Sequence, residues 1–120
     1  MRHLVSALAL VALFSPSARA ADGLSGAWSS GTGAGSRTYV FKVHGDRFDG
    51  IMCGPCDDPS SVFRIEDGRM LDAERVSFSI AYGSHREEIG GTRSGSQLTL
   101  RAQREGGSGP PVNAVVKRVM

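Results

Sequence analysis

The chain contains little of what marks a membrane protein or a partner of polyanions. Its longest apolar run, over residues 4–14, is about eleven residues, whereas a transmembrane helix needs about twenty. Basic residues outnumber acidic ones by only 14 to 12, and they form no cluster that would attract nucleic acid or an anionic membrane surface. We therefore expect no membrane anchor and no nucleic-acid partner.

The short apolar run has the setting of a secretory signal peptide. A basic start at residues 1–3 precedes it, and the small-x-small motif Ala18-Arg19-Ala20 follows. We expect cleavage after Ala20, a single domain over residues 21–120, and a secreted or periplasmic location. Position 21 is Ala and not Cys, which argues against a lipoprotein. Loss of Arg2 and Arg19 leaves 12 basic and 12 acidic residues, so the mature chain is neutral.

Aromatic residues make up only 7% of the sequence, while all 16 glycines lie after the signal segment. A domain of about 100 residues with this composition buries a small core and gains from a covalent crosslink in an oxidising compartment.

The mature sequence has the two-residue alternation of β-strands. The alternating stretches lie at residues 38–43, 47–51, 76–82, 98–103 and 112–116. Short turn sequences separate them, namely Gly45-Asp46, Asp67-Gly68, Asp72-Ala73-Glu74, Gly83-Ser84, Ser94-Gly95 and the loop over residues 106–111. We predict an all-β fold, a single small antiparallel up-and-down β-barrel, with a β-sandwich as the alternative. Glycines inside strands, at Gly50 and Gly90-Gly91, predict bulges or bends.

The lone tryptophan lies in Gly26-Ala27-Trp28 at the start of the first strand, and Lys117-Arg118 lies near the end of the last. In a closed barrel these strands are neighbours, so Arg118 is expected to stack on the indole of Trp28. The pair resembles the signature of the lipocalin, or calycin, superfamily. The stretch over residues 26–50 is also similar to the start of avidin-type barrels, which bind biotin with several tryptophans.

The only two cysteines form the motif Cys53-Gly54-Pro55-Cys56, whose spacing is that of thioredoxin-type redox sites. The following Asp57-Asp58-Pro59 leaves little room for the helix that such a site needs to stabilise a thiolate. Three hypotheses stay open. The pair is a structural disulfide stapling a turn, a redox-active disulfide with Cys53 as nucleophile and Cys56 as resolving thiol, or half of a metal site completed by histidines. We favour the structural disulfide.

Other polar groups predict no catalytic set. His85 beside Ser84 has acids nearby at Glu87 and Glu88, but neighbouring strand residues point to opposite faces, which does not favour a catalytic set. We expect the paired acids to be turn and solvent-face residues. The Gly-rich loop at residues 31–36 lacks the lysine of a phosphate-binding loop. We expect no metal and no cofactor, and an enzyme is the less favoured class.

The remaining aromatic residues are candidates for the core or for the lining of a ligand cavity, and we favour a packed interior. With Trp28 and Arg118 they form the candidate set of Phe41, Phe48, Phe78 and Tyr82. The preferred hypothesis is an exported, non-catalytic barrel that binds a small apolar ligand or a protein. One alternative is a thiol-disulfide redox protein. The other is a periplasmic peptidase inhibitor, because the chain is similar in size, export and Gly-x-Trp start to a calycin-like inhibitor family whose N-terminal segment enters the protease.

Overall fold

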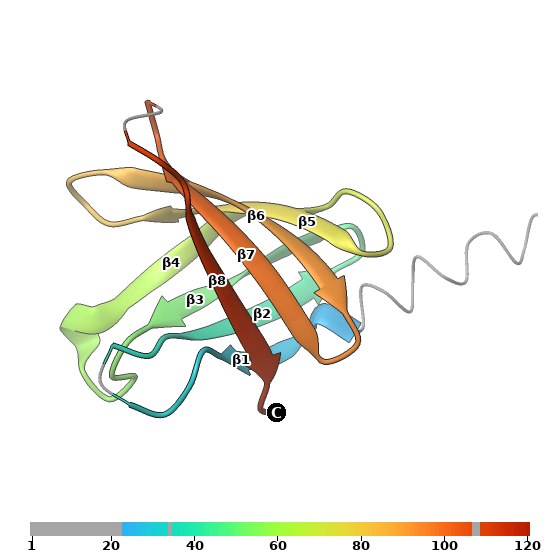
Figure 1. Cartoon of the computed structure of the whole chain (residues 1–120), viewed down its shortest axis with the longest axis horizontal. Coiled ribbons are helices and arrows are strands. Elements are labelled where there is room, and N and C mark those ends of the chain that lie inside the picture. Colours follow the sequence, from blue (N-terminus) through green and yellow to red (C-terminus); the bar gives the residue numbers. More distant parts are fainter. Residues whose placement is uncertain (1–22, 34, 107–108) are drawn as a thin grey trace, which may run out of the picture.

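The described residues, 23–33, 35–106 and 109–120 of a computed structural model, form eight strands in a single closed barrel (Figure 1). The signal segment predicted from the sequence lies outside the described residues. Every strand is antiparallel to its neighbours in chain order, and the last pairs with the first. The strands are β1 (Gly26–Ser29), β2 (Thr38–His44), β3 (Arg47–Cys53), β4 (Val62–Met70), β5 (Arg75–Ala81), β6 (Arg86–Ser94), β7 (Gln97–Arg104) and β8 (Val112–Arg118). The predicted up-and-down barrel is confirmed, and the sandwich alternative is excluded.

The alternation in the sequence becomes the inner and outer faces of the barrel. On β5, for example, Val76, Phe78 and Ile80 are at most 2% exposed and belong to the core. Burial of each such side chain contributes roughly 1.5–3 kcal/mol to folding. No helix in the described part of the chain is long and apolar enough to cross a membrane.

Three phenylalanines from different strands fill the middle of the barrel. The rings of Phe41 (β2), Phe48 (β3) and Phe78 (β5) meet edge to face, with centroids 5.4–5.8 Å apart. Edge-to-face contact brings the positive ring edge to the negative face and stabilises each pair beyond its burial. The expected packed interior is therefore present in the middle of the barrel.

The barrel closes through β1 and β8. The Arg118 guanidinium lies 4.4 Å from the ring centroid of Trp28, and its Nη1 donates a hydrogen bond of 2.8 Å to the carbonyl of Ser25. The indole N–H of Trp28 donates to the carbonyl of Leu24 at 2.9 Å. The stacking expected from the Gly-x-Trp motif and the late arginine is confirmed.

Two glycine predictions had different outcomes. Gly50 lies at a bulge in the β3–β4 ladder with φ 154°, and a Cβ there would lie 1.8 Å from the Val40 carbonyl oxygen. Gly90-Gly91, in contrast, pairs in continuous register with both neighbouring strands, so of the predicted bulge or bend the bulge is absent there.

The turn predicted at Asp67-Gly68 is also wrong, because β4 runs through this dipeptide as a bulged strand. Asp67 takes the left-handed conformation, with φ 55°, and the register with β5 shifts between Glu66 and Arg69. Asp-Gly serves a bulge as well as it serves a turn, since both need a residue with positive φ.

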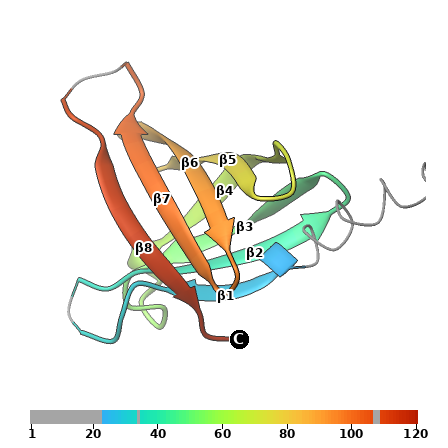
Figure 2. The same cartoon turned by 45° about the vertical axis from the view of Figure 1, so that its right-hand side comes forward.

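The two ends of the barrel are built differently. One end carries the short β2–β3, β4–β5 and β6–β7 connections and both chain ends of the barrel. The other end, which we call the mouth, carries the connections at residues 30–37, 54–61, 82–85 and 105–111. Figures 1 and 2 show β8 diverging from the β1–β2 connection toward the mouth.

Replacement of Arg118 tests the closure. Arg118→Ala removes the stacking on Trp28 and the hydrogen bond to Ser25, and we expect the free energy of unfolding to fall by about 2 kcal/mol. Urea denaturation measures this loss. Lys117→Ala, at the exposed neighbouring position, is the control and should change stability by less than about 0.5 kcal/mol. Equal effects of the two substitutions would contradict a special role for Arg118.

Candidate functional site

A cavity of about 270 Å³ opens at the mouth of the barrel, and we call it the mouth cavity. Its apolar wall comes from β6, β7 and β8, with the side chains of Ile89, Leu100, Ala102, Ala114 and Val116. The polar residues that line it are Ser30, Arg37, Tyr39 and Glu87, and Gly35 also lines it. A concave apolar site with a few polar groups is the usual form of a ligand site.

The cavity exists because small side chains replace large ones near the mouth. Ala102 and Ala114 stand on β7 and β8, whereas the middle of the barrel holds phenylalanine rings. Along β7 the inward residues therefore shrink from Leu98 and Leu100 to Ala102. The interior is packed in its middle and hollow at the mouth.

Glu87 turns into this hollow, and the prediction that it faces solvent is wrong. It shares the inner face of β6 with buried Ile89, because residues two apart on a strand point to the same side. The Tyr82 hydroxyl donates a hydrogen bond of 2.8 Å to Oε1 of Glu87. Its neighbour Glu88 is exposed and accepts a hydrogen bond from Ser79, as a residue of the outer face should.

Burial and charge act together on the tyrosines at the mouth. Desolvation raises the pKa of Tyr82, and the hydrogen bond to the Glu87 carboxylate raises it further, because a phenolate would lie against a negative charge. Desolvation also raises the pKa of Tyr39, although the nearby Arg37 guanidinium opposes this shift. Burial alone would lower the pKa of Arg37, but the two tyrosines and Glu87 raise it.

The cysteines form a disulfide at the same end of the barrel, between the end of β3 and the short 3₁₀ helix η1 (Pro59–Ser61). Cys53 is 1% exposed, while Cys56 lies in the exposed connection. The crosslink joins a core position to a surface loop, as expected of a turn staple. Since attacking thiolates are accessible, buried Cys53 is poorly placed as a nucleophile. Bonded sulfurs also offer no thiolate to a metal.

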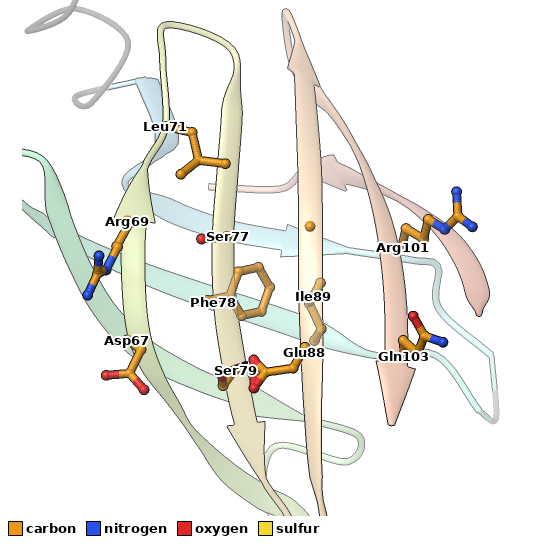
Figure 3. A pocket seen from close by; sticks show the side chains of 11 residues that line it. Asp67, Arg69, Leu71, Ser77, Phe78, Ser79, Glu88, Ile89, Arg101 and Gln103 are labelled. Carbon is orange, nitrogen blue, oxygen red and sulfur yellow. Dashed lines mark hydrogen bonds between the residues drawn. The ribbon is translucent and has the colours of Figure 1, made fainter. Parts of the chain in front are cut away.

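A second hollow, of about 720 Å³, lies on the outer face of β4–β7 (Figure 3). Ser77, Ser79 and Gly90 are among its lining residues, and the long side chains of Arg69 and Arg101 point away from each other at its sides. It is a broad depression on the solvent side of the sheet, produced by small residues between long ones. Leu71, Phe78 and Ile89 also line it, together with the charged or polar side chains of Asp67, Arg69, Glu88, Arg101 and Gln103.

The acids around this outer hollow are already paired with one arginine. Arg86 contacts Glu66 at 2.7 Å and Asp67 at 2.6 Å, with Glu88 and Glu105 at 3.8 and 3.9 Å. Desolvation would lower the pKa of Arg86, but Glu66, Asp67 and Glu88 raise it. The cluster ties β4, β6 and the end of β7 together on the surface.

The histidines form no catalytic or metal centre in the described residues. Ser84 Oγ lies 3.1 Å from His85 Nδ1, but no described carboxylate lies within 4.0 Å of His85 to orient it as a base. The His85 ring stacks on Tyr82 instead. His44 lies 3.6 Å from Asp49 on the surface, and no described group of three or more potential ligands is arranged for a metal ion.

The candidate set from the sequence thus separates into three places. Trp28 and Arg118 close the barrel, the three phenylalanines fill its middle, and Tyr82 reaches the mouth. Sequence reasoning missed Glu87 and Arg37. For Glu87 a signal existed, since it lies two residues before Ile89 in an alternating strand. For Arg37, in a Gly-rich connection, no pattern pointed to the cavity.

A closed eight-stranded antiparallel barrel is compatible with the lipocalin-like resemblance of the Gly-x-Trp motif. No protein-family model, no curated protein and no solved structure matches the chain.

Titration of Tyr82 tests the mouth geometry. In a Tyr39→Phe background Tyr82 is the only tyrosine, so its ultraviolet absorbance reports one group. We expect Glu87→Gln to lower the pKa of Tyr82 toward 10.0, because a neutral amide does not repel the phenolate. Glu88→Gln, on the outer face, should leave it unchanged, and an equal effect of both variants would contradict the contact.

The raised pKa also gives the sign of a pH dependence. The native state holds the Tyr82 proton more tightly than the unfolded chain does. The contribution of Tyr82 to the free energy of unfolding is therefore fully present below about pH 10 and is lost as pH rises through the native pKa. Urea denaturation at increasing pH measures this loss, and Glu87→Gln should reduce it.

The disulfide is expected to stabilise the fold modestly. Closing so short a loop contributes about 2 kcal/mol by chain entropy, so Cys53→Ala with Cys56→Ala should lower the free energy of unfolding by that amount. A reductant should lower the stability of the parent protein and leave the double variant unchanged. No difference between parent and variant would show that the bond is not a staple.

Proposed function

We propose that the protein is an exported, non-catalytic, lipocalin-like binding module that holds a small apolar group in the mouth cavity. The observation that carries the proposal is the contrast inside one barrel, where aromatic rings fill the middle and alanines leave a hollow at the open end. The signal-peptide pattern and the disulfide support an oxidising location outside the cytoplasm.

The volume defines the size of that group. At about 270 Å³ the cavity is larger than the 150 Å³ that accepts benzene in an engineered cavity and lies just below the range of drug-sized pockets. A short alkyl chain or a single ring fits this space. The side chains of Tyr39 and Glu87 can exchange hydrogen bonds with a polar group of the ligand that stays at the mouth.

A series of 1-alkanols from butanol to decanol tests the proposal by isothermal titration calorimetry. Each added methylene should tighten binding about fourfold while the cavity still has room, since burial contributes about 0.8 kcal/mol per methylene. The gain should stop once the chain fills the cavity.

Matched phenylalanine substitutions on one strand supply the control. Ala102→Phe fills the mouth cavity and should abolish alkanol binding, whereas Thr99→Phe places the same ring on the outer face of β7 and should preserve it. Absence of binding for the whole series, or equal binding by both variants, would overturn the proposed function.

A further inference from the structure

Beside the mouth cavity, β8 has an edge for which the described residues supply no backbone partner. β1 is only four residues long and pairs with β8 at Trp28↔Arg118 and Ser29↔Lys117. After Ser29 the chain turns back, and Ser30 N–H donates to the carbonyl of Arg37 within the β1–β2 hairpin. Among the described residues, the stretch Val112–Val116 therefore pairs with β7 alone.

The register shows which backbone groups face the open side. Arg118 N–H donates to Ser96 on the β7 side, and Val119 N–H donates to Ala27 on the β1 side. In an antiparallel ladder alternate residues bond to opposite neighbours. Counting back in twos from Val119, the N–H and C=O groups of Val115 and Asn113 point to the open edge, where β1 would lie if it were longer.

This edge lacks the devices that usually protect one. Natural edge strands carry charges, prolines or bulges that block pairing with another chain. No charged residue, proline or bulge interrupts Val112–Val116, and the side chains of Val112 and Val115 are 65% and 47% exposed.

The open edge also borders the mouth cavity. Val112, Ala114 and Val116 line the cavity from β8, and Ser30, Gly35 and Arg37 line it from the β1–β2 connection. A strand added along β8 would therefore cross the opening. Cross-strand neighbours share a face, so a residue opposite Ala114 would project its side chain into the apolar space.

We propose that the partner is an extended polypeptide segment that adds to the edge of β8, antiparallel to it, and inserts one apolar side chain into the mouth cavity. The segment continues the existing β1–β8 ladder, with Val115 and Asn113 supplying backbone hydrogen bonds and the cavity selecting the side chain. The inference rests on the proposed function, because it names the molecule that brings the apolar group.

Residue-resolved hydrogen exchange with the synthetic peptide acetyl-TVTLTVT-amide tests the proposal. At a peptide concentration ten times its Kd, exchange at the Val115 and Asn113 amides should slow about tenfold. The Ala114 amide is an internal control, because it already bonds to β7 and should change little.

Two altered peptides separate the two contacts. Replacement of the central leucine by aspartate removes the apolar side chain, and N-methylation of backbone groups along one edge removes donors while keeping the side chains. Both should abolish the protection. Protection that survives both changes would overturn the proposal.

On the protein side, Val115→Pro removes an N–H that faces the open edge and no bond to β7. It should lose peptide binding and keep alkanol binding, while Val115→Thr keeps both. If Val115→Pro does not fold, the N-methylated peptide makes the equivalent deletion from the ligand side.

The outcomes distinguish the two proposals. A protein that binds no alkanol contradicts the proposed function. A protein that binds alkanols but shows no peptide protection at Val115 and Asn113 contradicts only the strand addition. Concentration-dependent protection of these amides without peptide would mean that a second copy of the chain occupies the edge, and it would likewise overturn the proposal.

Discussion

The short pairing between β1 and β8 is the constraint on which the rest of the barrel depends. Its few hydrogen bonds are reinforced where Arg118 lies over Trp28 and bonds to Ser25, so the first and last strands are joined by stacking as well as by backbone. Because β1 ends at Ser29, closure covers only one end. The same shortness leaves an open mouth and, among the described residues, a stretch of β8 that pairs with β7 but with no strand on its other side, so closure and opening have one cause.

Side-chain size then divides the interior. Edge-to-face contact of Phe41, Phe48 and Phe78 makes the middle solid, and Ala102 and Ala114 keep the mouth hollow. A small barrel can in this way remain stable through its packed middle and still retain space for a ligand at one end. The disulfide lies at the mouth as well, joining buried Cys53 to the exposed connection that follows β3. Covalent restraint thus falls at the end with the longer connections.

The two faces of β6 carry glutamates with different polar neighbours. Glu87 faces inward, accepts a hydrogen bond from Tyr82 and shares the mouth with Arg37, whereas Glu88 faces outward to Ser79 beside the Arg86 cluster. These two adjacent glutamates have different environments because successive side chains of a strand point to opposite faces of the sheet. Only the inner one can interact with a bound molecule in the cavity.

The sequence alone predicted five of the strands by alternation, the first strand by its Gly-x-Trp motif, an up-and-down barrel with a sandwich as the alternative, and the closing contact, because these are local patterns with a direct physical meaning. The structure added β4 and β6 and decided for the closed barrel. Local patterns were ambiguous at Asp67-Gly68, where the same dipeptide suits a turn or a bulge, and the strand pairing chose the bulge. Only the tertiary structure decided that Glu87 faces the cavity, that Arg37 lines it and that β8 extends beyond the end of β1. These features depend on register and on the relative lengths of strands distant in the chain, which no short window of sequence contains.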